Sequence, residues 1–376
     1  MRISAMLAIT YATVLPATLP AQGVPRTVLS EPDAVLAEPF SYVSGLSELS
    51  DGRVLVSDRI ELAVRRVDFA SGQIDLLGHE GRGPGEYQMP GALFPLPGDS
   101  SLLVDLGNMR LTVIAPDGTL SGSQPLMRPD GLFIFPRGVD AEGRLYLEMS
   151  NFQLAPGQQI PDSFAIARYH PSTDAVDTVG FVPRPQMGQM RSGGGGVSFS
   201  GLEPFQATDA WGVAPDGRVA IARPEPYHVE WLSLTGEGAV GPDLVYGPVR
   251  VTSADKEAWA DEISGGAVAA IGRSSSGGGG RAMNLPRPDI DETEFPEYKP
   301  AFPRNAVSVT PEGEAWVKRY VAHGEPETFD VFDAAGRRIR QVVLPQNRRL
   351  VGFGQGTLYA VSVDANDLQW LERYRR

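Results

Sequence analysis

Cationic, aromatic and amide side chains at the ends of apolar strands carry the clearest binding chemistry in this sequence. Arg, Lys, Tyr and His side chains donate hydrogen bonds to negatively charged or hydroxyl-rich ligands. We therefore predict a site for a small anionic or polyhydroxy ligand. Its candidate residues are Arg59, Asn108, Arg110, Arg137, Asn151, Trp211, Tyr227, His228, Lys318, Arg319, Tyr320 and His323. The alternative for these residues is an ordinary role as solvated loop ends paired with carboxylates.

Motifs for catalysis and metal binding are absent from the sequence. The histidines His79, His170, His228 and His323 show neither H-x-H nor H-E-x-x-H spacing, so no zinc signature exists. The run Gly81–Glu86 lacks the Lys-Ser/Thr pair of a phosphate-binding loop, and no G-x-S-x-G motif for a nucleophilic serine occurs. We predict no catalytic residue, no metal ligand and no cofactor.

A bound divalent cation is the alternative to this prediction. Its oxygen ligands would come from residues that end a second strand of a repeat or begin the loop after it. Those candidates are Glu148, Asn108, Asn151 and Asp364.

Composition narrows the class of partner. The formal net charge is −13 and the pI is about 4.9, so the chain repels a phosphate backbone and nucleic acid is not an expected partner. The sequence contains no cysteine, which removes disulfides and thiolate sites. Gly 43 and Pro 32 among 376 residues indicate many turns. An all-β fold with short strands is favoured.

The first 23 residues have the pattern of a secretory signal. Arg2 is the positive residue, an apolar stretch follows to Leu15, and Ala21-Gln22-Gly23 is a small-x-small cleavage site. We expect residues 1–23 to be removed and residues 24–376 to form the mature protein. No second apolar run is long enough to span a bilayer, so a periplasmic or secreted location without a membrane span is expected.

A hairpin pattern recurs six times along the chain. Each occurrence has an apolar strand, a turn rich in Gly, Asp and Glu, and a second strand with alternating apolar residues. The occurrences are at 49–58, 97–106, 140–149, 214–223, 310–319 and 353–362. A third strand follows each hairpin, at 63–69, 110–116, 164–170, 228–234, 328–334 and 368–374.

A fourth short strand follows most of these repeats, for example at 73–78 and 339–345. Four antiparallel strands repeated six times predict a six-bladed β-propeller. The last repeat stops at its third strand. We therefore expect residues near 27–36 to supply its fourth strand and to close the ring.

Two long insertions interrupt the repeats, at 183–207 and 247–304. The second is proline-rich and contains the one predicted helix, over 253–271. It has a capping box formed by Thr252 and Asp255, and an apolar stripe at Trp259, Ile263 and Ala267. Both insertions join a fourth strand to the next first strand. We expect them on the face of long loops around the mouth of the central channel, where the ligand site would lie.

Part of the sequence resembles NHL-type repeats. Val104, Asp105, Asn108, Arg110 and Leu111 resemble the V-x-D-x-x-N-x-R-hydrophobic core of those repeats. The segment Gly81–Tyr87 is similar to the G-x-GPGEF corner of bacterial six-bladed β-propeller proteins, and 296–318 is also similar to that family. In the first repeat, Glu61 and Ala63 stand where Asn108 and Arg110 stand in the second. The resemblance implies a secreted binding or scaffold protein and indicates little about catalytic activity.

The leading functional hypothesis is an exported, non-catalytic propeller that binds a ligand or a protein partner on the long-loop face. An alternative is a divalent-metal-dependent enzyme of the lyase or lactonase kind, which the resemblance to NHL-type propellers allows. A further alternative is a protein-interaction scaffold that docks through the 247–304 insertion. An exposed apolar patch around Trp259 would favour that role.

Overall fold

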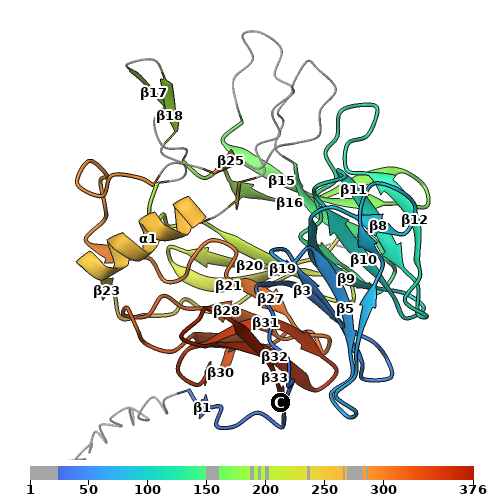
Figure 1. Cartoon of the computed structure of the whole chain (residues 1–376). Coiled ribbons are helices and arrows are strands. Elements are labelled where there is room, and N and C mark those ends of the chain that lie inside the picture. Colours follow the sequence, from blue (N-terminus) through green and yellow to red (C-terminus); the bar gives the residue numbers. More distant parts are fainter. Residues whose placement is uncertain are drawn as a thin grey trace, which may run out of the picture.

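The computed structural model describes residues 24–149, 161–186, 190–193, 196–199, 203–234, 238–265, 267–268, 283–284 and 287–376. Residues 1–23, the predicted signal segment, lie outside this range. The described chain folds as a six-bladed β-propeller, as the repeats predicted (Figure 1).

The first three blades are regular four-stranded antiparallel sheets. Blade 1 contains β3 (Val43–Glu48), β4 (Val54–Asp58), β5 (Ala63–Val67) and β6 (Ile74–Leu77). Blade 2 contains β9 (Pro90–Leu96), β10 (Ser100–Asp105), β11 (Arg110–Ile114) and β12 (Leu120–Pro125). Blade 3 contains β13 (Gly138–Val139), β14 (Leu145–Met149), β15 (Ser163–His170) and β16 (Ala175–Pro183).

The last three blades follow the same order of strands. Blade 4 contains β19 (Ala210–Val213), β20 (Val219–Pro224), β21 (Tyr227–Leu232) and β22 (Ala239–Val240). Blade 5 contains β27 (Val307–Val309), β28 (Ala315–Lys318), β29 (Thr328–Phe332) and β30 (Arg338–Val343). Blade 6 contains β31 (Arg348–Gly354), β32 (Thr357–Val363) and β33 (Gln369–Arg375) from the end of the chain.

Short strands outside the blades belong to the connections. The corner between blades 1 and 2 contains the parallel pair β7 (His79–Glu80) and β8 (Glu86–Tyr87). The connection from blade 3 to blade 4 contains the hairpin β17 (Met190–Gly193) and β18 (Gly196–Phe199). The connection from blade 4 to blade 5 contains β23 (Val249–Arg250), α1 (Ser253–Gly265), β24 (Ala267–Val268), β25 (Met283–Asn284) and β26 (Tyr298–Lys299).

The first hairpin of every blade is closed by a turn that needs a left-handed backbone conformation. Glycine adopts positive φ without the steric cost that a Cβ brings, and the repeated glycine of the pattern takes this role. Those glycines are Gly52, Gly98, Gly143, Gly217, Gly313 and Gly356. The turn chemistry read from the sequence therefore determines where each blade begins.

The N-terminal segment closes the ring, as predicted. Strand β2 (Ala34–Val35) pairs antiparallel with β33 and becomes the outer strand of blade 6. The preceding strand β1 (Arg26–Val28) behaves differently, since it pairs parallel with β30 and adds a fifth strand to blade 5. In Figure 1 the first strands, in blue, consequently lie beside the last, in red.

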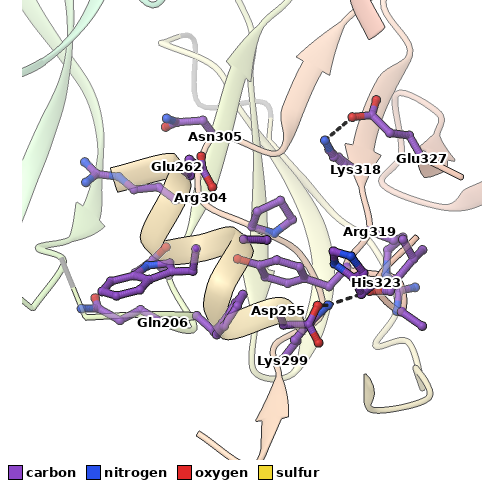
Figure 2. A pocket seen from close by; sticks show the side chains of 18 of the residues that line it. Gln206, Asp255, Glu262, Lys299, Arg304, Asn305, Lys318, Arg319, His323 and Glu327 are labelled. Atoms are coloured by element: carbon purple, nitrogen blue, oxygen red, sulfur yellow. Dashed lines mark hydrogen bonds and ion pairs between the residues drawn. The ribbon is translucent and has the colours of Figure 1, made fainter. Parts of the chain in front are cut away.

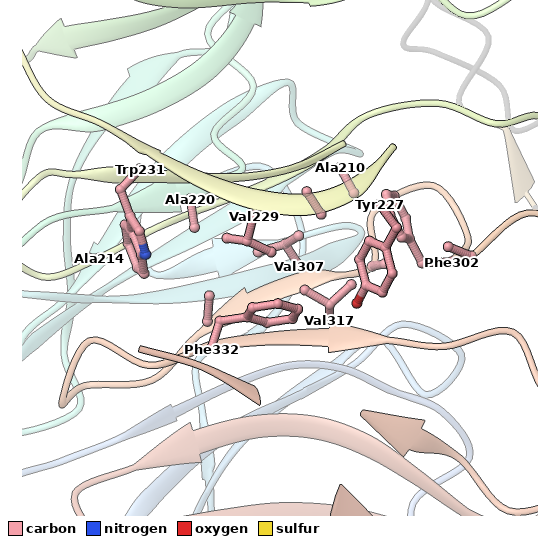
Figure 3. Close-up of a cluster of buried hydrophobic side chains, with 14 residues drawn as sticks. Ala210, Ala214, Ala220, Tyr227, Val229, Trp231, Phe302, Val307, Val317 and Phe332 are labelled. Carbon is pink, nitrogen blue, oxygen red and sulfur yellow. The ribbon is translucent and has the colours of Figure 1, made fainter. Parts of the chain in front are cut away.

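The hydrophobic core consists of layers between neighbouring blades. Figure 3 shows one such layer, in which side chains of blade 4 face those of blade 5 around Tyr227, Val229 and Phe332. The inner strands approach one another closely near the axis. A Cβ on Gly45 of β3 would lie 2.5 Å from the amide nitrogen of Leu93 on β9, so only glycine fits there.

The helix is shorter than predicted. α1 ends at Gly265 instead of residue 271, and Ala267 lies in β24, so it does not extend the apolar stripe of Trp259 and Ile263. Consecutive glycines at 265 and 266 explain this end, because glycine in a helix has a high conformational entropy cost. No helix in the described part of the chain combines the length and apolar character needed to cross a membrane.

Candidate functional site

A cavity of about 580 Å³ lies between α1, the segment before β27 and the loop from β28 to β29 (Figure 2). Both insertions contribute to it, the first through the segment before β19 and the second through α1 and β26. Its lining residues are Pro185, Glu203, Phe205, Gln206, Thr208, Asp255, Ala258, Trp259, Glu262, Ile263, Lys299, Pro303, Arg304, Asn305 and 318–325 with Glu327.

The first turn of α1 is anchored by the predicted capping box. The amide and the hydroxyl of Thr252 donate to Asp255 Oδ2 at 2.9 and 2.7 Å, and the amide of Asp255 donates to Thr252 Oγ1 at 3.3 Å. This reciprocal pair satisfies donors that the start of a helix leaves free. Ala260, two turns later, is fully buried, so the helix packs on the propeller.

Lys299 joins α1 to blade 5 beneath the cavity. Its Nζ donates to Asp255 Oδ1 at 2.6 Å and to the carbonyl oxygen of Val321 at 2.8 Å, and both charged side chains are only 5% exposed. The same Nζ lies 5.8 and 5.7 Å from the ring centres of Phe205 and Tyr320. A buried, fully engaged ion pair of this kind holds the helix and the loop in one arrangement.

Aromatic rings form one wall of the cavity. Phe205 and Tyr320 meet edge to face at 5.5 Å, and Trp259 meets Phe295 edge to face at 5.4 Å. Burial raises the pKa of the Tyr320 hydroxyl, and the nearby carboxylate of Glu262 raises it further, so the hydroxyl stays protonated. Such a wall offers apolar faces and one hydrogen-bond donor to a ligand.

The cations that line the cavity are held by protein acceptors. Lys318 pairs with Glu327, and Arg319 donates to Asp330 at 2.8 Å and to the carbonyl oxygen of Ala301 at 2.8 Å. A ligand that carried only negative charge would therefore compete with these carboxylates.

Other polar side chains at the cavity are without partners. The side chains of Glu203, Glu262, Glu325 and His323 have no hydrogen-bond or ion-pair partner among the described residues, although all four residues line the cavity. Thr208 Oγ1 is a buried atom that also has no hydrogen-bond partner among the described residues. Buried hydroxyls are normally satisfied, so this one is suited to a water molecule or a ligand group.

The structure brings four of the predicted site residues together. Lys318, Arg319, Tyr320 and His323 all line the cavity. They lie at the end of β28 and in the loop that follows it, which explains why their types and spacing were visible in the sequence. The remaining candidates lie elsewhere or form other contacts.

Asn108 and Arg110 hold the glycine-rich corner in place. Asn108 Nδ2 donates to Asp105 and to the carbonyl oxygen of Gly81, and the guanidinium of Arg110 donates to the carbonyl oxygens of Gly83 and Glu86. Asp105 itself is fully buried and accepts bonds from the backbone. These NHL-like residues thus connect blades 1 and 2. The Asn108 amide and the Arg110 terminal nitrogens are used in these contacts, and Arg110 Nε lies 3.6 Å from Asp105.

Arg59, Arg137 and Trp211 form cation–π contacts outside the cavity lining. The guanidinium of Arg59 lies 4.0 Å from the ring centre of Tyr42, and that of Arg137 lies 4.8 Å from Trp211. Trp211 is only 3% exposed and packs in the core between blades 3 and 4, and it does not line the cavity. The pleat directs side chains of an inner strand toward neighbouring blades.

Tyr227 and His228 are structural as well. The hydroxyl of Tyr227, a buried residue, donates to Asp330 at 3.0 Å. His228 Nδ1 donates to the carbonyl oxygen of Pro226 at 2.8 Å and lies 3.7 Å from Asp243. Asn151 falls outside the described residues.

The candidate oxygen ligands for a cation that the structure describes, Glu148, Asn108 and Asp364, do not come together. Glu148 forms an ion pair with Arg137, Asn108 holds the corner, and Asp364 accepts bonds from its own turn and from Trp370. In the described ranges, no group of three or more His, Asp or Glu side chains is placed to hold a metal ion.

Sequence reasoning missed several residues of the cavity wall. Phe205, Lys299 and Glu262 come from the two insertions, which the sequence marked as long and loop-like without assigning contacts. Trp259 was noted for its helical stripe. Instead of forming an outward patch, it is half-buried, contacts Phe295 and lines the cavity.

Acid should destabilise the protein through carboxylates with lowered pKa values. Burial raises the pKa of Asp255 and of Glu314, but hydrogen bonds from Lys299 and Thr252, and from Arg340, outweigh it and leave both values below their ordinary range. A lowered pKa contributes stability above the unfolded-state value, and this contribution disappears as the pH falls through the folded-state value. We expect the melting temperature to fall between about pH 5 and pH 2.

The variant Asp255→Asn tests this assignment. It should be less stable than the unmodified protein at pH 7, and the difference should shrink near pH 2, where the carboxylate is protonated in both states. Melting curves at the two pH values provide the measurement. An equal difference at both would show that the ionised carboxylate is not responsible.

Comparison with known proteins identifies no family. No protein-family model and no curated protein matches this sequence. Among solved structures, the chain is similar to a member of the DUF4221 family from Bacteroides vulgatus (10% identity, 91% of this chain and 96% of that chain covered, TM-score 0.49). It is also similar to a gluconolactonase from Xanthomonas campestris (11% identity, 90% and 91%, TM-score 0.44). A third is virginiamycin B lyase from Staphylococcus aureus (10% identity, 91% and 87%, TM-score 0.41).

Proposed function

We propose that this protein is an exported, non-catalytic propeller that binds a small polar ligand in the cavity between α1 and blade 5. The observation that carries the proposal is the cavity itself, with aromatic rings, open polar groups and ion pairs that hold its walls. Its volume of about 580 Å³ suits a small molecule. Export is part of the proposal because of the signal pattern in residues 1–23.

Preorganisation supports binding at this place. Asp255 and Lys299 connect α1 to β26, and Lys299 continues to the loop at Val321. Three separate segments are therefore held in position before a ligand arrives. A site that is already ordered loses less entropy on binding, which raises affinity.

The alternative functions find less support in the contacts of the described residues. A metal-dependent lyase or lactonase would use Glu148, Asn108, Asn151 or Asp364. The side chains of Glu148, Asn108 and Asp364 are engaged with protein groups, and Asn151 lies outside the described residues. A scaffold that docks through Trp259 would need that ring on an exposed patch, whereas the ring contacts Phe295 and faces the cavity.

A cavity-filling variant tests the proposal. Ala322 is exposed and lines the cavity, so Ala322→Trp should obstruct it without breaking a buried contact. Ala254→Trp on α1 is the matched control, because Ala254 is exposed but does not line the cavity. The measurement is a thermal-shift screen with sugars, organic acids, amines and amino acids. A ligand at a hundred times its dissociation constant adds about 2.7 kcal/mol of stability.

We expect at least one class of ligand to raise the melting temperature of the unmodified protein and of Ala254→Trp, but not of Ala322→Trp. Equal shifts in both variants would place binding elsewhere. Turnover of any compound in the panel would contradict the non-catalytic part of the proposal.

A further inference from the structure

The two walls of the cavity carry uncompensated charges of opposite sign. On one side, a single carboxylate serves two guanidinium groups. Glu148 forms a close ion pair with Arg137, and Arg304 reaches the same carboxylate at 3.5 Å. Arg137 is further held by Asn305 and by the ring of Trp211. One positive charge is therefore left over on this side.

Arg304 is the group that presents this charge to the cavity. Its side chain is 35% exposed, against 21% for Arg137, and it lines the cavity. Its contact with Glu148 is longer than a normal hydrogen bond. Arg304 can therefore form a two-pronged hydrogen bond with a carboxylate of a ligand while Arg137 keeps Glu148 neutralised.

Glu262 of α1, which also lines the cavity, carries a negative charge without an ion-pair partner among the described residues. It does not form an ion pair with Arg304 although both line the cavity. Figure 2 shows the two side chains together, beside Asn305. Glu203 and Glu325 add further open carboxylates to the lining. The cavity therefore offers an ammonium group of a ligand two kinds of favourable contact, namely carboxylates and aromatic faces.

The other lysine and arginine side chains of the lining are paired with carboxylates. Lys299 is paired with Asp255, Lys318 with Glu327 and Arg319 with Asp330. A ligand with charge of one sign would satisfy one wall and leave the other without a partner. A ligand with both signs would satisfy Arg304 and Glu262 together.

We propose that the cavity binds a small zwitterion, a free α-amino acid, whose carboxylate contacts Arg304 and whose ammonium group contacts Glu262. The side chain of the ligand lies against Trp259 and Tyr320. This inference rests on the proposed function, since it names the ligand class of the same cavity.

Isothermal titration calorimetry with three matched compounds tests the inference. Phenylalanine carries both charges, phenylalanine amide carries only the ammonium group, and N-acetylphenylalanine carries only the carboxylate. We expect phenylalanine to bind, and each of the other two to bind at least about tenfold more weakly, because each leaves one charged wall without a partner. Equal affinity of either derivative would overturn the zwitterion assignment.

Two variants test separately whether Glu262 contacts the ammonium group and whether Arg304 contacts the carboxylate of the ligand. Glu262→Gln should weaken phenylalanine binding about tenfold or more and leave N-acetylphenylalanine unchanged, whereas Arg304→Gln should weaken phenylalanine and leave the amide unchanged. Glu257→Gln is the control, because Glu257 lies on α1 outside the cavity lining. An equal loss in Glu257→Gln and Glu262→Gln would overturn the role of Glu262.

The screen of ligand classes distinguishes failure of the zwitterion inference from failure of the proposed function. If phenylalanine fails to bind but a sugar, acid or amine raises the melting temperature and Ala322→Trp abolishes that shift, the zwitterion inference is wrong and the proposed function stands. If no class of ligand produces a shift that depends on the cavity, both are wrong.

Discussion

Replacing Asp330 with alanine is expected to lower the free energy of unfolding by about 3–5 kcal/mol, because it leaves a buried charge without its partner. Asp330 lies on β29 and is fully buried. Its carboxylate accepts hydrogen bonds from Tyr227 at 3.0 Å, Arg319 at 2.8 Å, Gln341 at 3.1 Å and Arg338 at 3.4 Å. Tyr227 belongs to blade 4, so the carboxylate also connects two blades. Urea denaturation measures the effect.

Two further variants test whether the unpaired buried charge causes the loss of stability in Asp330→Ala. Asp51→Ala removes an exposed ion pair with Arg53 in a turn, and it should cost no more than about 1 kcal/mol. The double variant Asp330→Ala with Arg319→Met should be more stable than Asp330→Ala alone, because it removes the closer and more buried of the two cations, Arg319 and Arg338, that lose their carboxylate. A double variant less stable than the single one would show that lost packing, not the unpaired charge, dominates.

The second large effect is expected at the closure of the ring. Phe40 is 1% exposed and packs with Leu36, Tyr359 and Leu371, which brings the N-terminal segment against blade 6. Its amide donates to the carbonyl oxygen of Gln369 at 2.8 Å, and the amide of Gln369 donates back at 2.8 Å. Removing the ring should cost about 3–5 kcal/mol, so Phe40→Ala should strongly lower the stability measured in urea.

The consequence for closure can be measured separately. In Phe40→Ala the segment before residue 40 should become sensitive to proteases, because local opening detaches β2 from β33. Val35→Ala is the control, since Val35 lies on β2 but is 51% exposed, and it should behave like the unmodified protein. Equal protease sensitivity in both variants would show that the strand pairing does not depend on the core around Phe40.

Several parts of the fold were predictable because their signals are local. Gly52 and Gly143 mark turns that need positive φ, and the residues after them alternate with the period of a strand. The capping box of Thr252 and Asp255 likewise predicted the start of α1 to within a residue. The end of α1 was predicted too late, since an apolar residue at Ala267 was counted as helical although two glycines precede it.

The roles of individual polar residues were less predictable. Asn108 and Arg110 have the chemistry of ligand-binding side chains, but they donate to carbonyl oxygens of the glycine-rich corner. Trp211 was a candidate ligand-binding residue, but its ring packs between blades 3 and 4. Both misreadings have one cause, because residue type indicates what a side chain can bind and not which partner lies beside it.

The sequence by itself determined the number of blades, the start of each hairpin, the closing segment and the place of the insertions, since propensity, turn chemistry and period act over a few residues. Only the tertiary structure decided which charges are satisfied. Lys299 donates a hydrogen bond to Asp255, which is 44 residues away in the sequence, and Tyr227 donates one to Asp330, which is 103 residues away. Arg304 shares the carboxylate of Glu148 with Arg137, and Glu262 has no ion-pair partner among the described residues, although both line one cavity. Their partners depend on contacts between distant segments, which no local pattern records.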